Sequence, residues 1–263
     1  MKGIICYFSL TGNTKLACEY IDKKISNVTF EYYDITTDEE PNFSAYDLIG
    51  FATYTDFFEP GQLMKTYMQN FNGDGKLAFV FNTYGQMSGN TLFTMAQTAK
   101  SSNLKVIEAY SLHVPENYPP LIKNGTTNEE YPRNNDLESF NEFITNLNSK
   151  VTQLSNGGTI TEKNIKKSIF ISVTKKLLSI INMDKMGVKN VHKDQCTGCG
   201  ICASVCPYDA ISMVDGYPKF DESKCESCFA CYNMCPTKSI YTPKLDGVGH
   251  YNKPHKNLIE KLK

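Results

Sequence analysis

Short apolar runs alternate with amphipathic stretches through the first 155 residues of the chain. The apolar runs, rich in β-branched and aromatic residues, are 2–8, 28–34, 46–53, 76–81 and 105–111. The stretches with apolar residues at helical spacing are 15–24, 62–71, 91–100 and 137–154. Runs of the first kind are typical of strands buried on both faces of a parallel sheet. The alternation therefore predicts an α/β domain with a doubly wound, five-stranded parallel sheet, and a small α+β domain is expected to follow it.

The last third of the chain contains two copies of one cysteine pattern. Residues 196–207 and 225–236 both have the form C-x2-C-x2-C-x3-C-P, and together they hold eight of the ten cysteines. The thiolate is a soft ligand that suits iron–sulfur clusters, and three cysteines spaced in this way can surround one cubane. Zinc sites also use C-x2-C pairs, but they do not repeat a third step that ends in C-P. A disulfide framework is the other alternative, and residues 2–8 are too short for the apolar core of a signal peptide.

This cysteine pattern resembles that of the bacterial-type dicluster ferredoxins. In those proteins the fourth cysteine of each copy ligates the cluster of the other copy. The resemblance implies two 4Fe-4S clusters. The ligands of the first would be Cys196, Cys199, Cys202 and Cys235. The ligands of the second would be Cys225, Cys228, Cys231 and Cys206.

A loop rich in hydroxyl groups follows the first predicted strand. It has the sequence S-L-T-G-N-T from Ser9 to Thr14, and a predicted helix comes next. Backbone N–H groups and the helix dipole bind anions at such a junction. The loop has neither the G-x-G-x-x-G pattern of dinucleotide sites nor the G-x4-G-K-[ST] pattern of NTP sites. A turn with a helix cap is the alternative that needs no ligand.

The loop resembles the [S/T]-x-[S/T]-G-x-T phosphate loop of flavodoxins, in which the ligand is FMN. The resemblance covers residues 1 to about 155 and implies the flavodoxin strand order 2-1-3-4-5. It implies that the FMN phosphate is bound by Ser9, Thr11, Gly12, Asn13 and Thr14. It implies that the loops after the third and fourth strands contact the flavin ring through Thr53, Tyr54, Asn82, Thr83, Tyr84 and Gly85, with Phe57 and Gly89 as further candidates. Phe57 could equally pack into the core or an interface, and the lack of tryptophan leaves the stacking partner open.

These features predict four parts of the chain. An FMN domain is expected over residues 1–155, a linker over 156–186, a ferredoxin domain over 187–242 and a tail over 243–263. The linker includes a basic amphipathic stretch, residues 163–185, which is expected to pack on one of the domains. The alternative is that this stretch lies on a membrane surface. The tail carries no recognisable chemistry.

The charge is distributed unevenly between the two halves. Residues 1–159 hold 11 basic and 18 acidic residues, a net charge of −7, and residues 160–263 hold 16 and 10, a net charge of +6. A basic half could suggest nucleic acid. Two anionic clusters explain it more simply, so no nucleic-acid partner is expected. No apolar run is long enough to span a bilayer, so a cytoplasmic protein without stable membrane insertion is expected.

The architecture as a whole resembles the flavodoxin–ferredoxin fusion proteins of anaerobic bacteria. The resemblance implies electron transfer among the clusters, FMN and a partner, which would be a redox enzyme or a ferredoxin-type donor. A flavin-dependent reductase of a small substrate and a redox or iron sensor are the alternatives. The sequence has no His/Asp catalytic constellation and no pyridine-nucleotide motif, and this favours the carrier. The oligomeric state and the direction of electron flow are left open.

Overall fold

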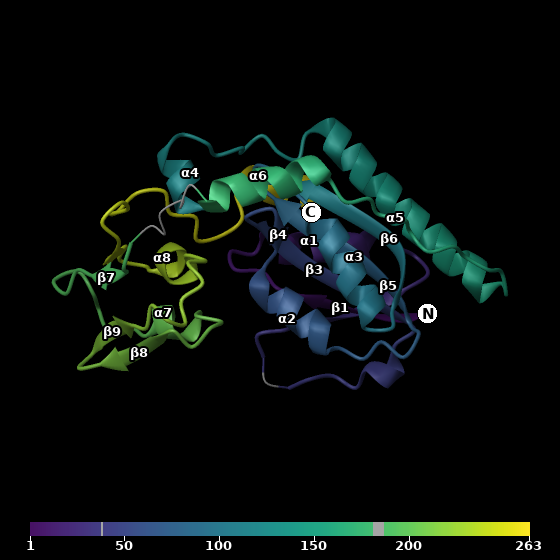
Figure 1. The fold of residues 1–263 in the computed structure, drawn as a ribbon, viewed down its shortest axis with the longest axis horizontal. Coiled ribbons are helices and arrows are strands. Elements are labelled where there is room, and N and C mark those ends of the chain that lie inside the picture. Colours follow the sequence, from purple (N-terminus) through teal and green to yellow (C-terminus); the bar gives the residue numbers. More distant parts are fainter. Residues whose placement is uncertain (38, 181–186) are drawn as a thin grey trace.

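The first domain is built on one parallel sheet (Figure 1). The structure is a computed structural model that describes residues 1–37, 39–180 and 187–263. The long strands are β1 (Lys2–Tyr7), β2 (Thr29–Asp34), β3 (Leu48–Asp56), β5 (Leu77–Tyr84) and β6 (Lys105–His113). They are all parallel, in the order β2-β1-β3-β5-β6. The short β4 (Glu59–Pro60) only pairs with β3 as an antiparallel hairpin, so the predicted order 2-1-3-4-5 is confirmed for the five long strands.

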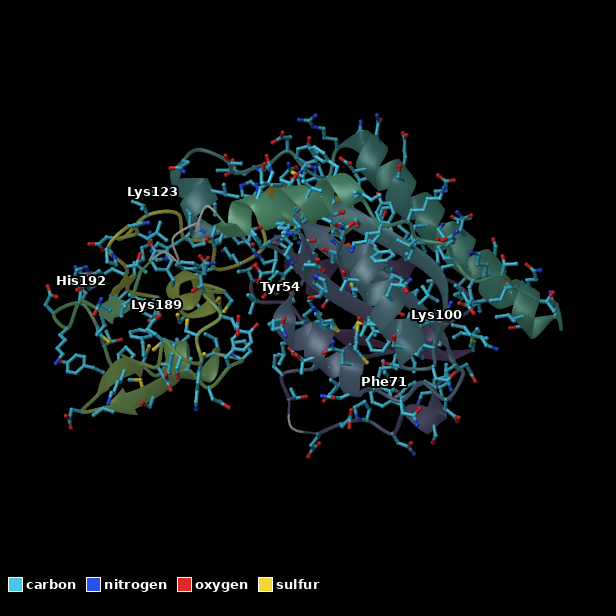
Figure 2. The ribbon with its side chains drawn as sticks, viewed as in Figure 1. Tyr54, Phe71, Lys100, Lys123, Lys189 and His192 are labelled. Atoms are coloured by element: carbon cyan, nitrogen blue, oxygen red, sulfur yellow. The ribbon has the colours of Figure 1, made fainter. Side chains whose placement is uncertain are left out.

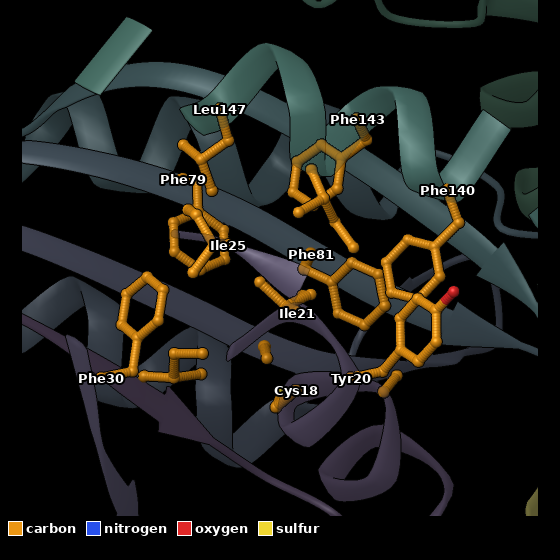
Figure 3. Packing of buried hydrophobic residues seen from close by; sticks show 14 of the residues in the cluster. Cys18, Tyr20, Ile21, Ile25, Phe30, Phe79, Phe81, Phe140, Phe143 and Leu147 are labelled. Atoms are coloured by element: carbon orange, nitrogen blue, oxygen red, sulfur yellow. The ribbon is translucent and has the colours of Figure 1, made fainter. Parts of the chain in front are cut away.

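Helices cover both faces of this sheet. The helices α1 (Asn13–Lys24) and α5 (Asn134–Ser155) lie on one face, and α2 (Gln62–Asn70) and α3 (Thr91–Ser101) lie on the other. Figure 3 shows the first layer, in which Phe140 and Phe143 of α5 pack against Phe81 of the sheet. The long helix α5 begins where the Arg133 N–H donates to the Asp136 carboxylate at 2.7 Å, which supplies a partner at the helix start. Between β2 and β3 the described residues include one turn of 3₁₀ helix, Phe43–Ala45.

Two strands extend beyond their predicted ends. Thr53 ends the predicted third strand, but β3 continues through Tyr54 to Asp56, and Thr83 lies within β5. The extension of β3 is explained by the hairpin with β4, which the sequence did not indicate. Its turn is formed by Phe57 and Phe58, both with positive φ angles, of 41° and 69°. Large side chains rarely adopt this conformation, and so the turn escaped prediction.

The second domain consists of two similar halves. Its strands are β7 (Asn190–Val191), β8 (Ile211–Val214), β9 (Tyr217–Phe220) and β10 (Ile240–Tyr241), paired as β7 with β10 and β8 with β9. Each half carries one short helix, α7 (Ile201–Ser204) or α8 (Ala230–Met234). Each helix follows the first two cysteines of one copy of the cysteine pattern.

The remaining segments connect the two domains. They contain α4 (Pro119–Lys123), α6 (Ile169–Ile180) and α9 (Lys256–Leu262). The chain after residue 243 returns to the first domain, where Leu258 and Leu262 are buried in the same core as α1 and α5 (Figure 1). The predicted domain boundaries stay a prediction, and residues 181–186 of the predicted linker lie outside the described residues. None of the described helices is both long and apolar enough to cross a bilayer.

Candidate functional site

Two cavities in the second domain are each lined by four cysteines. One, of about 340 Å³, is lined by Cys206, Cys225, Cys228 and Cys231. The other, of about 310 Å³, is lined by Cys196, Cys199, Cys202 and Cys235. The structure thus brings together the two quartets that the sequence pattern predicts as cluster ligands. We call them the inner cavity (Cys206, Cys225, Cys228, Cys231) and the outer cavity (Cys196, Cys199, Cys202, Cys235).

The backbone curls around each cavity in the same way. In the outer copy, Gly198 and Gly200 have φ angles of 67° and 74°. In the inner copy, Ser227 and Phe229 occupy the equivalent positions with φ angles of 54° and 59°. A left-handed residue on each side of the second cysteine turns the chain so that successive cysteines face one centre. Among the described residues, no three His, Cys, Asp or Glu side chains are grouped so that they could hold a single metal ion.

A buried lysine lies at the inner cavity. The side chain of Lys189 is only 3% exposed, and its Nζ donates to the Cys225 Sγ at 3.0 Å. The same Nζ lies 5.3 Å from the centre of the Phe229 ring. Although burial disfavours its charge, the thiolate partner and nearby acidic groups raise the pKa of Lys189, so the ammonium is retained. Figure 2 shows Lys189 inside the second domain.

The outer cavity is more open and lacks a charged donor of this kind among its lining residues. Cys199 is exposed, and Cys235 lies 3.4 Å from the Ser239 hydroxyl and 3.6 Å from that of Thr237. Burial would raise the pKa of Cys235, but the hydrogen bonds from Ser239 and Thr237 outweigh it and lower that pKa. At the inner cavity, by contrast, burial raises the pKa of Cys228 to about 12.

The predicted phosphate loop leads into the first turn of α1. Gly12, with φ at 94°, precedes the first turn of α1, which contains no acidic residue. Within the described part of the chain, the backbone amides of Gly12, Asn13 and Thr14 have no protein hydrogen-bond acceptor. The side chains of Thr11 and Thr14 are buried at the same place, and the Thr14 hydroxyl lies 2.8 Å from that of Thr83. Free amides and buried hydroxyls at a helix start fit the phosphate of FMN.

A second feature supports a ligand beside this loop. The Thr53 hydroxyl is buried at the carboxyl end of β3 without a hydrogen-bond partner. The turn at Phe57 and Phe58 packs against Gly89, where a Cβ atom would lie only 2.4 Å from the Phe58 Cα. Buried polar atoms in folded proteins are nearly always paired, so an unpaired hydroxyl here fits a polar group of a bound ring.

Some predicted ring contacts are occupied by other protein groups. The Asn82 amide donates to the Thr55 hydroxyl at 2.7 Å, and the Asn82 Oδ1 accepts from Ser111 at 2.5 Å. The Tyr84 ring stacks on His113, with the centroids 4.7 Å apart. Asn82 therefore connects β3, β5 and β6 inside the sheet, while the Tyr84 ring packs on β6. Asn13 donates its side-chain amide to the Pro115 carbonyl at 3.2 Å, so its backbone amide is the group left for a phosphate.

The inner cavity lies next to the end of β3. The Tyr54 hydroxyl is buried beside Tyr208, without a regular hydrogen bond, and Tyr208 lines the inner cavity. Burial, and then the proximity of Tyr208 and Cys228, raises the pKa of Tyr54 well above its ordinary value. Figure 2 shows Tyr54 on the side of the first domain that faces the second domain. A residue predicted to flank the flavin thus lies close to a predicted cluster ligand.

The loop after β6 contributes residues that sequence reasoning did not single out. Glu116, 6% exposed, accepts from the amides of Asn117 and Tyr118, both at 2.9 Å. A Cβ atom on Gly85 would lie 2.4 Å from the Glu116 carboxylate. Burial raises the pKa of Glu116. A single glutamate in this loop gave no signal of burial in the sequence.

Comparisons with known proteins agree with both parts of this description. Residues 4–110 match the family model described as a flavodoxin domain, and residues 195–239 match that described as a 4Fe-4S dicluster domain. No curated protein matches the chain.

Solved structures similar to the chain include several flavodoxins. A flavodoxin from the domain Archaea is 20% identical over 58% of this chain and 99% of its own, with a TM-score of 0.43. Flavodoxin 1 from Bacillus cereus is 19% identical over 56% of this chain and 96% of its own, with a TM-score of 0.43. A flavodoxin, WrbA-like protein from Agrobacterium tumefaciens is 16% identical over 58% of this chain and 98% of its own, with a TM-score of 0.42.

Proposed function

Because the chain combines a flavodoxin domain with a 4Fe-4S dicluster domain, which gives it a role in electron transfer, we propose that it is an internal relay. Electrons pass between FMN at the Ser9–Thr14 loop and an outside redox partner, through one cluster in each cysteine-lined cavity. FMN exchanges up to two electrons and each cluster exchanges one. The relay therefore allows a partner that gives or takes single electrons to work with a two-electron centre.

The observation that carries this proposal is the position of the inner cavity. Tyr54 at the end of β3 is buried against Tyr208, which lies two residues after Cys206. The outer cavity, with the exposed Cys199, is on the open side of the second domain. This arrangement supports an order in which the partner meets the outer cluster and the inner cluster meets the flavin.

The chain's own residues have distinct parts in this relay. The amides of Gly12, Asn13 and Thr14 would hold the FMN phosphate, and the Thr53 hydroxyl is the polar group available to the ring. Lys189 would donate to the thiolate of Cys225 and so stabilise the more negative, reduced form of the inner cluster. Phe229 would exclude water from the inner cavity, because its ring is buried against Tyr118 and Tyr232.

The loop after β6 favours a carrier over a reductase. A reductase would use this loop to close a substrate pocket over the flavin. Here Asn117 accepts from the Asn233 amide at 3.1 Å, and the Tyr118 ring lies 5.6 Å from that of Phe229. The Asn117 amide also binds the Thr11 hydroxyl, so the loop bridges the two domains, and this contact fits a relay between them.

The decisive experiment is anaerobic purification followed by counts of iron, sulfide and flavin per chain. We expect one FMN and two 4Fe-4S clusters, and rapid bleaching of the flavin when a single-electron donor reduces the clusters. A preparation with no flavin, or with iron for only one cluster, would contradict the proposal. A reduced protein that is reoxidised by small substrates but by no redox protein would favour the reductase.

A further inference from the structure

Residues after the second cysteine copy bind both domains in turn. The Tyr232 hydroxyl donates to the Val248 carbonyl at 2.6 Å, and the Tyr232 and His250 rings stack with centroids 4.1 Å apart. The chain then passes over the phosphate loop. A Cβ atom on Gly12 would lie 3.0 Å from the Pro254 side chain. It ends in α9, whose Leu258 is fully buried in the core of the first domain.

Four hydrogen bonds close a ring between the phosphate loop and α8. Asn117 Nδ2 donates to the Thr11 hydroxyl at 2.7 Å, and Asn233 Nδ2 donates to the Asn117 carbonyl at 3.1 Å. The Tyr251 N–H donates to Asn233 Oδ1 at 3.0 Å, and the Tyr251 hydroxyl donates to Asn13 Oδ1 at 2.9 Å. The peptide from Thr11 to Asn13 completes the ring. We call these residues, Thr11, Asn13, Asn117, Asn233 and Tyr251, the coupling ring.

Asn233 occupies a special position in this ring. It lies two residues after Cys231, which lines the inner cavity, and two residues before Cys235, which lines the outer cavity. Its side chain is 2% exposed, and both ends of its amide are used within the ring. A buried amide that lost either partner would carry a desolvation cost. The conformation of the chain between the two cysteines therefore fixes the point to which Asn117 and Tyr251 can bind.

The other side of the ring holds the phosphate loop. The Asn13 side chain is fixed at both ends, by the Pro115 carbonyl and by the Tyr251 hydroxyl. The Thr11 hydroxyl is fixed by Asn117. With these side chains held, the backbone amides of Gly12 and Asn13 stay free to face an anion. The loop geometry that suits a phosphate thus depends on Asn117 and on Tyr251 of the tail, and both of these residues bind Asn233 of the second domain.

We propose that the coupling ring links cluster loading to FMN affinity, with Asn233 and Tyr251 as the positioning residues. The inference rests on the proposed function, because it requires both cofactors at the assigned places. Ligation of Cys231 and Cys235 fixes the turn that carries Asn233. The hydrogen bonds of the coupling ring then hold the phosphate loop in one conformation. Because binding free energies are reciprocal, bound FMN must favour retention of the clusters at equilibrium by the same factor by which the clusters strengthen FMN binding, and slower iron release is the readout of this effect. The protein then retains its flavin best when the clusters that serve it are present.

The test uses the full chain with its clusters loaded anaerobically and its flavin removed by dialysis. The dissociation constant of FMN is measured by quenching of flavin fluorescence, and iron release to a chelator is timed with and without saturating FMN. In the unaltered protein we expect FMN to slow iron release by about fivefold or more, the size typical of coupled sites. Tyr251→Phe removes the hydroxyl that donates to Asn13 and also accepts from the His255 N–H at 2.9 Å. The loss of the bond to Asn13 should raise the FMN dissociation constant by about fivefold. Asn233→Leu removes both amide contacts and should abolish the protection of iron by FMN.

Tyr241→Phe is the matched control, because it removes a hydroxyl from β10, outside the coupling ring, and should change neither measurement. If Asn233→Leu does not load clusters, Tyr251→Phe decides alone, since it leaves the chain between the cysteines unaltered. The inference is overturned if FMN gives no protection in the unaltered protein. It is also overturned if the variants weaken FMN binding but keep the full protection factor. A chain that binds no FMN, or no clusters, would instead remove the proposed function itself.

Discussion

The inner and outer cavities come from one repeated cysteine pattern and have similar volumes, about 340 and 310 Å³. Their surroundings differ. The outer cavity has an exposed cysteine and receives neutral hydroxyl groups at Cys235. The inner cavity has a buried ammonium at Cys225 and lies against the flavodoxin domain. The comparison indicates that the pattern determines where the ligands lie, whereas the residues between the cysteines give each site its electrostatic setting.

The backbone conformations of the two cysteine copies also come from residues of different kinds. Glycine adopts the left-handed conformation at no steric cost in the outer copy, but Ser227 and Phe229 must adopt it in the inner copy. Such a conformation costs a non-glycine residue of order 1 kcal/mol. Phe229 compensates for this cost by burial, since its ring is 1% exposed and contacts Tyr118 of the flavodoxin domain. The strained copy is therefore the one that forms the interface.

The largest effect should come from removing one cysteine from each cavity. Cys228→Ala and Cys199→Ala should each lose half of the iron. If the inner cluster is the one that exchanges electrons with FMN, a donor protein should still reduce the outer cluster of Cys228→Ala while the flavin stays oxidised. In Cys199→Ala the same donor should reduce neither the inner cluster nor the flavin. Iron analysis and stopped-flow absorbance measure the two effects. Flavin reduction at the normal rate in Cys228→Ala, with the inner cluster absent, would break the comparison.

The next largest effect concerns the interface side chain. Phe229→Ala should destabilise the protein by about 3 kcal/mol, because it removes a buried ring at the contact between the two domains. The free energy of unfolding in urea measures this change. Val214→Ala, in β8 of the second domain, is the control. Val214 is 48% exposed, so the free energy of unfolding should change by no more than about 0.5 kcal/mol. Equal losses of stability in the two variants would mean that the Phe229 side chain has no special role in the interface.

A smaller effect should follow the removal of the buried charge. Lys189→Met should lower the reduction potential of the inner cluster and leave that of the outer cluster unchanged. An interaction that differs by about 1.4 kcal/mol between the two redox states shifts a one-electron potential by about 59 mV. A redox titration followed by EPR would separate the two clusters. Lys193→Met is the surface control, and Ser239→Ala should give a weaker shift at the outer cluster, because its donor is neutral. An unchanged inner potential would exclude electrostatic tuning by Lys189.

The smallest effect concerns Glu116, in the loop after β6. Burial raises the pKa of Glu116, so the folded protein binds its proton more tightly than the unfolded chain does. Stability should therefore fall as the pH rises from the ordinary range of a glutamate through the folded pKa. Glu116→Gln keeps an oxygen for the amides of Asn117 and Tyr118 but removes this pH dependence. Urea unfolding at acidic and at mildly alkaline pH measures the free energy of unfolding of both proteins. Relative to the wild type, Glu116→Gln should be more stable at the higher pH than at the lower pH.

The fold and the cysteine quartets could be predicted from the sequence because each depends on local periodicity or spacing. The five long strands followed from apolar runs, their order followed from the resemblance to flavodoxins, and the cavity linings matched the quartets. The β3–β4 hairpin could not be predicted, because it depends on two aromatic residues in a conformation that favours glycine. Lys189 gave no signal either, since nothing in its neighbourhood distinguishes a lysine that will be buried from one that faces water.

The tail was the largest omission. Residues 243–263 were predicted to be a tail without recognisable chemistry, yet Leu258 and Leu262 complete the first core. Two leucines on a helix of under two full turns are too weak a pattern to indicate burial against a distant segment. Likewise, Asn82 was assigned to the flavin because it ends a strand, but its partners Thr55 and Ser111 come from neighbouring strands. Contacts of this kind depend on the assembled sheet.

The position of α9 has a consequence for a chain that a protease has cut once. The ferredoxin domain is attached to the flavodoxin domain by covalent connections on both of its sides, through the exposed residues 161–164 before it and through the segment that leads to α9 after it. A protease that cuts once at residues 161–164 would leave the second connection and the buried α9 in place. The two fragments should then migrate together under native conditions and separate only in denaturant. Electron transfer between the domains should continue after the cut, because the contacts that hold the two domains together do not include the cleaved peptide.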